Sequence, residues 1–95
     1  MRNYEAMCIL DADLDKEANE KAIEKVQDLI TKNAGKVENV DRWGRRKLAY
    51  LIDRHKDGFY VVIAFKGENT TIDEVDRVLK LTGEIVRFMI VRVGE

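Results

Sequence analysis

Hydrophobic and polar residues alternate in two ways along the chain. A two-residue period, typical of strands, runs through residues 2–10, 37–52, 59–65 and 86–93. Three- and four-residue spacing, typical of amphipathic helices, is found between Asp11 and Gly35 and between Thr71 and Gly83. The predicted order of elements is therefore β-α-β-β-α-β.

Two crossovers in that order place both helices on one face of a four-stranded antiparallel sheet. The predicted fold class is α+β, ferredoxin-like. The first strand and the third strand, residues 59–65, carry apolar residues on both faces, which is typical of central strands. A chain of 95 residues is expected to form one domain, residues 1–95, with one modest core.

Local signals predict where the elements begin and end. Asp13 or Asp15 is suited to start the first helix, and Gly35 to stop it. For the second helix, Thr71 to Glu74 form a capping-box pattern and Gly83 a stop. Residues 53–58, which end in Asp-Gly, are expected to turn the chain between the second and third strands.

The sheet face away from the helices is also expected to be apolar. With no third layer, six side chains there would be exposed as one patch, which usually marks a protein interface. The six are Met7, Ile9, Tyr60, Val62, Met89 and Val91.

Charge is unevenly distributed along a chain whose net charge is −1. Residues 42–66 hold seven Lys or Arg and two Asp or Glu, a net charge of +5, whereas residues 1–41 have a net charge of −4. A local excess of cations matters more than the sum when the partner is a polyanion. The middle of the chain is therefore the candidate for binding nucleic acid.

The segment W-G-R-R-K-L-A-Y-L-I, Trp43 to Ile52, concentrates this charge. Arg45, Arg46 and Lys47 follow one another, and a regular strand would divide them between two faces. A bulge at or before Gly44 would let them converge on phosphate oxygens. Solvated charge that protects a strand edge is the competing interpretation. Two interpretations of His55 also stay open, a solvated loop residue and a contact with a phosphate or a base.

The residues present argue against catalysis. The chain has no serine, one histidine and one cysteine, so Ser-His chemistry and a Cys/His zinc site are excluded. Cys8 is expected to be an inert core residue. Asp11, Asp13 and Asp15 lack the glycine and glutamate of a calcium loop. We expect no enzyme, metal, cofactor or small-molecule substrate, and no membrane segment.

The sequence resembles the bacterial small-subunit ribosomal protein family S-six over essentially its whole length. The resemblance lies in three segments, of which the second is the most specific: R-N-Y-E-A-M-C-I-L, W-G-R-R-K-L-A-Y-L-I and V-R-F-M-I-V-R. Leu51 stands where the family often has proline, and Asp53 where it often has a basic or small residue.

This resemblance implies a cytoplasmic ribosomal protein that binds the central domain of small-subunit ribosomal RNA, in the platform, paired with a ribosomal protein of the S-eighteen family. The RNA-contact candidates that it implies are Arg2, Arg42, Trp43, Arg45, Arg46, Lys47, His55, Arg87 and Arg92. The apolar outer face would be the dock for the protein partner. The alternative function is a homodimeric or small-molecule-sensing interaction module.

Overall fold

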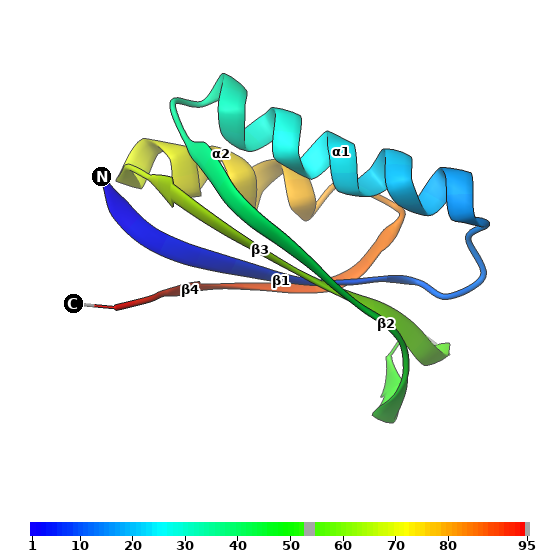
Figure 1. The fold of residues 1–95 in the computed structure, drawn as a ribbon. Coiled ribbons are helices and arrows are strands. Elements are labelled where there is room, and N and C mark those ends of the chain that lie inside the picture. Colours follow the sequence, from blue (N-terminus) through cyan, green and yellow to red (C-terminus); the bar gives the residue numbers. More distant parts are fainter. Residues whose placement is uncertain (53–54, 95) are drawn as a thin grey trace.

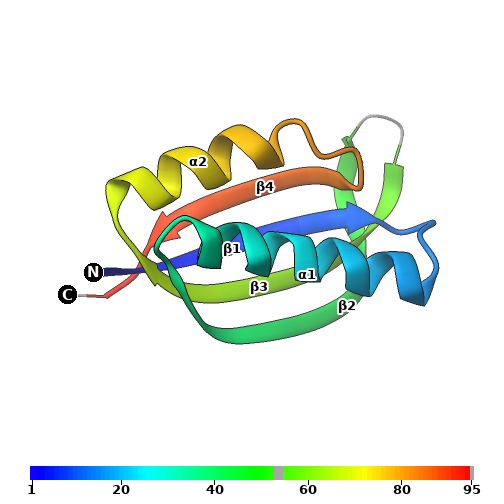
Figure 2. The ribbon, with the colours of Figure 1, turned by 90° about the horizontal axis from the view of Figure 1, so that it is seen from above.

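The computed structural model describes residues 1–52 and 55–94, with the backbone alone for residues 49–52 and 55. The elements are β1 (Arg2–Asp11), α1 (Lys16–Lys32), β2 (Lys36–Ile52), β3 (His55–Gly67), α2 (Asn69–Leu79) and β4 (Ile85–Arg92). The strands form one antiparallel sheet in the order β2-β3-β1-β4, with both helices on one face (Figures 1 and 2). The predicted ferredoxin-like α+β fold and its central strands are confirmed.

The core lies between the helices and the sheet. Alternate residues of β1 face the helices and are buried, as their spacing predicts. Tyr4 stacks on Phe65 of the neighbouring strand, with ring centroids 5.7 Å apart. From α1, the buried apolar residues are Ala22, Ile23, Val26 and Ile30. No helix among the described residues is long and apolar enough to span a membrane.

Helix α1 begins as predicted and ends slightly earlier than predicted. The Asp15 carboxylate accepts a hydrogen bond from the Ala18 N–H at 2.7 Å. At the other end, Ala34 and not Gly35 takes the left-handed conformation, with φ of 65°. Gly35 is needed for space, because a Cβ there would lie 2.6 Å from the Ile30 side chain.

The predicted start of α2 is wrong. The helix begins at Asn69, and the cap is Glu68, whose N–H donates to Thr71 Oγ1 at 3.1 Å. Thr71 is fully buried within the first turn, and its hydroxyl donates to the Asn33 carbonyl at 2.6 Å. The predicted stop is also wrong: the helix ends at Leu79, four positions before Gly83. There the Thr82 hydroxyl donates to the Val78 carbonyl, so a threonine helps to close the helix end.

The predicted turn over residues 53–58 is wrong in its second half. Residues 55–58 belong to β3, and Ile52 pairs with His55, so only positions 53 and 54, outside the described residues, separate the strands. Gly58 serves close packing instead of a turn. A Cβ at that position would lie 2.3 Å from the Ile9 side chain.

Past Arg46 and Gly58, strands β2 and β3 continue without a third strand beside them, since β1 ends opposite Gly58. We call residues 47–52 and 55–57 the hairpin arm. Figure 1 shows the arm leaving the sheet where β1 ends and bending to the side opposite the helices. The arm and its base therefore project the most basic part of the chain from the body of the domain.

Candidate nucleic-acid interface

The bulges in β2 decide where its cations lie. The register shifts between Val37 and Asn39 and again between Arg42 and Gly44. The second shift confirms the bulge predicted near Gly44, which has a positive φ of 88° with nothing within 4 Å of its missing Cβ. Because of this bulge, Arg42 and Arg45 both pair with residues whose side chains face the helices. They converge beside the N-terminal end of α1.

Arg42 is held by a carboxylate of that helix. Its Nε and Nη2 donate to the two carboxylate oxygens of Glu20 at 2.9 and 2.7 Å. This fork lowers the pKa of Glu20 and raises that of Arg42, chiefly through the hydrogen bonds between them. Both side chains are about two-fifths exposed, so the pair is accessible to solvent and to ligands.

Arg45 is held in a similar way by the hairpin arm. Its Nε and Nη2 donate to one oxygen of Asp57 at 3.3 and 3.1 Å. Asp57 lies two residues before Phe59, the partner of Arg45 in the sheet, so the pair crosses the strands diagonally. Nη1 of each arginine takes no part in these ion pairs.

Arg46 and Lys47 are exposed at the base of the arm. The Arg46 Nη1 makes only a long contact of 3.5 Å with the Arg45 carbonyl. Within residues 1–52 and 55–94, neither side chain has a carboxylate at ion-pair distance. An incoming anion could therefore bind these two cations without breaking an ion pair to any carboxylate that the structure describes.

Trp43 lies on the opposite side of the strand from Arg42. Its ring stacks on Tyr60 with centroids 6.3 Å apart and an interplanar angle of 8°, and Nε1 donates to Asp41 at 3.0 Å. The ring is still 42% exposed. Trp43 is thus packed on one side and open on the other, a geometry that supports stacking by a base.

The remaining predicted RNA contacts lie apart from this cluster. Arg2 and Arg92 pair with Gly67 and Tyr4, at the end of the sheet opposite the arm. Arg87 pairs with Ile9, which places it on the outer face in the row of Tyr60. The side chain of His55 lies outside the described residues, so its role stays a prediction.

The outer face is less exposed than predicted. Ile9 and Val62 are each only 9% exposed, and Met7 and Tyr60 are half-buried. Gly58 lies directly against Ile9, and Leu48 is buried near the same glycine, so the arm covers this part of the face. The exposed part is a strip on β4, where Met89 is 53% and Val91 42% exposed.

The single cysteine of the chain is not part of this surface. Cys8 is fully buried in the core, and burial raises the pKa of its thiol to about 12, so the thiolate is not available at neutral pH. No cluster of three potential metal ligands occurs among the residues that the structure describes.

Three residues of this region were not predicted from the sequence. Glu20 and Asp57 lie 22 and 12 positions from their arginines, and no local pattern connects them. Asn19 did leave a signal: it is a polar residue on the inward stripe of α1, three positions before Ala22 and four before Ile23.

Together, the fold and the exposed cations define a ferredoxin-like domain with a basic hairpin arm, a class suited to bind a polyanion. A family model described as "Ribosomal protein S6" matches residues 3–92. The chain therefore belongs to this ribosomal protein family, as the resemblance in its sequence indicated.

Individual relatives agree with the family model. "Small ribosomal subunit protein bS6" of Clostridium novyi is 50% identical over 91 residues, which cover 96% of each chain. The protein of the same description from Thermoanaerobacter pseudethanolicus is 43% identical over the full length of both chains. The crystal structure of the 30S ribosomal protein S6 of Thermotoga maritima matches with a TM-score of 0.92 at 33% identity, covering 97% of this chain and 87% of that one. The chain is thus a bacterial small-subunit ribosomal protein, located in the cytoplasm on the ribosome.

Proposed function

We propose that residues 1–95 act as one non-catalytic domain that binds the central domain of small-subunit ribosomal RNA, in the platform. In this proposal the domain binds together with a ribosomal protein of the S-eighteen family and supports assembly of the subunit. The observation that carries the proposal is the hairpin arm, whose base presents Arg46 and Lys47 exposed and, among the described residues, without a carboxylate at ion-pair distance.

The shape of the arm supports contact with a folded RNA. The arm projects from the sheet as a two-stranded hairpin (Figure 1). Such a projection can reach into the grooves of a folded RNA, whereas the flat face of a sheet would contact only the outer edge of the RNA backbone. Arginine and lysine on such a projection neutralise phosphates and release the counterions bound there. The Trp43 ring, open on one side, lies next to these cations in the same strand.

The exposed strip on β4 is the observation that supports a protein partner in this proposal. Met89 and Val91 are exposed apolar side chains on one face of an edge strand, a surface that a partner would remove from water. Glu5 pairs with Val91 on this face, and Asp41 pairs with Val62 further along it. Carboxylates within an apolar surface favour a basic partner.

The RNA contact can be tested with the double substitution Arg46→Ala and Lys47→Ala. We expect RNA affinity to fall about tenfold, and the slope of log affinity against log salt to fall by about 1 for each lost phosphate contact. Filter binding to a central-domain RNA fragment at several salt concentrations measures both. Arg77→Ala, which removes an exposed arginine paired with Glu74 on α2, is the control. An unchanged affinity and slope in the double variant would exclude these cations from the RNA interface.

A further inference from the structure

A groove of about 370 Å³ lies at the N-terminal end of α1, on the side of the sheet that the helices cover. Its apolar lining comes from Leu14 in the loop before the helix and from Phe59 on β3, both half-buried. Its polar lining includes Lys16 and the two paired arginines, Arg42 and Arg45. The volume lies within the range of sites for small organic groups.

Asn19 sets this groove apart from an ordinary surface hollow. The residue is 7% exposed and lines the groove, yet its Oδ1 is buried without a hydrogen-bond partner among the described residues. Buried polar groups nearly always have partners, so this carboxamide is a place where one is missing. The terminal torsion of asparagine is broad, so the carboxamide can turn its oxygen or its nitrogen towards the groove.

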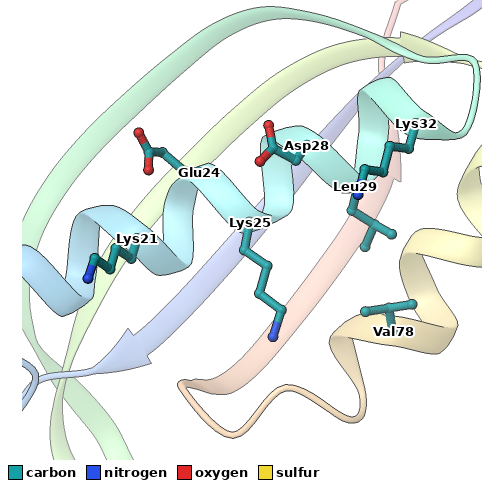
Figure 3. A pocket seen from close by; sticks show the side chains of 7 residues that line it. All are labelled: Lys21, Glu24, Lys25, Asp28, Leu29, Lys32 and Val78. Atoms are coloured by element: carbon teal, nitrogen blue, oxygen red, sulfur yellow. The ribbon is translucent and has the colours of Figure 1, made fainter.

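A second groove of similar volume, about 360 Å³, provides a contrast. It lies between α1 and α2, where Leu29 and Val78 point towards each other below a row of charged residues (Figure 3). Within the described part of the chain, no buried side-chain atom that lacks a partner belongs to the residues lining it. The groove beside Asn19 therefore has a specific recognition group that the other groove does not have.

We propose that the groove beside Asn19 holds one unstacked nucleotide of the bound RNA, an inference that rests on the proposed function. The base lies against Leu14 and Phe59, and the Asn19 carboxamide bonds to its edge with a donor and an acceptor once the buried Oδ1 has turned towards the groove. Adenine presents the matching pair at N6 and N7. Unstacked bases read in this way are the usual means of sequence-specific RNA recognition.

The arginines supply the anion-binding part of the site. Each ion pair leaves Nη1 unused, so a phosphate at the rim can accept from Arg42 and Arg45 while Glu20 and Asp57 stay in place. Lys16, at the start of α1, adds a positive side chain where the helix end is itself positive. The groove thus combines an apolar wall, a base-reading amide and phosphate donors.

The test is the substitution Asn19→Leu, with Gln27→Leu as the matched control. Both replace an amide by leucine on α1, but Gln27 does not line the groove. We expect Asn19→Leu to weaken binding to the central-domain RNA fragment about tenfold, while its urea midpoint is equal to or above that of the original chain. Gln27→Leu should leave RNA affinity unchanged. Equal RNA affinity for Asn19→Leu and the original chain would overturn the nucleotide site.

A second measurement uses the unsubstituted chain, so it does not depend on whether a variant folds. Adenosine 5′-monophosphate, titrated into the 15N-labelled chain, should shift the amide signals of residues 12–20, and adenosine without phosphate should shift them less. Absence of these shifts would overturn the site, and so would nucleotide binding combined with unchanged RNA affinity of Asn19→Leu. The Arg46 and Lys47 variant separates the two proposals. If it weakens RNA binding and Asn19→Leu does not, only the groove is wrong; if neither does, the RNA-binding function itself fails.

Discussion

Arg42 and Arg45 each lie against a carboxylate of their own chain, so in the proposed interface they would meet RNA phosphates while these internal ion pairs stay in place. Glu20 and Asp57 hold the guanidinium groups in fixed directions before any RNA is present. Such preorganisation lowers the entropy lost on binding, but the carboxylates also repel phosphates. Arg46 has no carboxylate partner among the described residues. Its contribution to RNA affinity should therefore come from attraction to phosphate alone, without an opposing repulsion from a neighbouring carboxylate.

The substitution Asp57→Asn separates these opposing effects. It keeps the shape of the side chain and removes its negative charge, so we expect RNA to bind about threefold more tightly at low salt, with a smaller gain at high salt. Gel-shift titrations at two salt concentrations measure this. Asp73→Asn, on the exposed side of α2, is the control and should change nothing. Weaker RNA binding by Asp57→Asn would mean that the carboxylate positions Arg45 more than it repels RNA.

At the scale of elements, two residues of types that usually end or cap a helix or strand, Gly58 and Thr71, lie inside elements and pack against other parts of the domain. The Asp-Gly pair at residues 57–58 has the sequence of a turn, yet Gly58 continues a strand because the adjoining space is filled by Ile9. Thr71 was predicted to be the first cap residue of α2, yet it is the third residue of the helix, where its buried hydroxyl accepts from the Glu68 N–H and donates to Asn33 at the end of α1. Local patterns could predict which elements exist, but these boundaries depend on contacts between residues distant in sequence.

Thr71 is the clearest case for a stability measurement. Thr71→Val keeps the volume and removes the hydroxyl, which leaves the Asn33 carbonyl and the Glu68 N–H without their partner. We expect the free energy of unfolding to fall by about 1–3 kcal/mol. Urea unfolding followed by circular dichroism measures it, with Thr70→Val, an exposed neighbour, as the control. Equal midpoints for the two variants would show that neither group loses a useful bond.

At the scale of the whole molecule, the sequence predicted the layers well and the surface less well. Apolar residues on both faces of β1 and β3 were enough to place these strands at the centre of the sheet. The same pattern predicted six exposed residues on the outer face, but the bend of the hairpin arm covers Ile9. Gly58 lies against Ile9 of β1 and beside the buried Leu48, and no strand periodicity encodes these contacts.

The exposed strip on β4 is the predicted contact surface for the protein partner, and it can be tested by substitution. Met89→Glu or Val91→Glu should weaken binding of the S-eighteen family partner about tenfold or more, because a charge would be buried in an apolar contact. Leu81→Glu is the control, since Leu81 is exposed but lies before β4 and outside the strip. Isothermal titration measures the affinity. Sedimentation of the chain alone tests the alternative: if it dimerises through this strip, the homodimeric module is the better description.

The sheet order also determines when the domain can fold. β1 is the first strand to be synthesised, yet it is central: Arg2 pairs with Gly67 on one side, and Tyr4 pairs with Arg92 on the other. Neither neighbouring strand is complete until residue 67 of the 95 has been made, and long-range pairing of this kind is intrinsically slow. The N-terminal strand, which is apolar on both faces, therefore lacks its second neighbour until β4 has been synthesised. Until β4 is available, β1 is an unpaired apolar segment, and such segments are prone to aggregate.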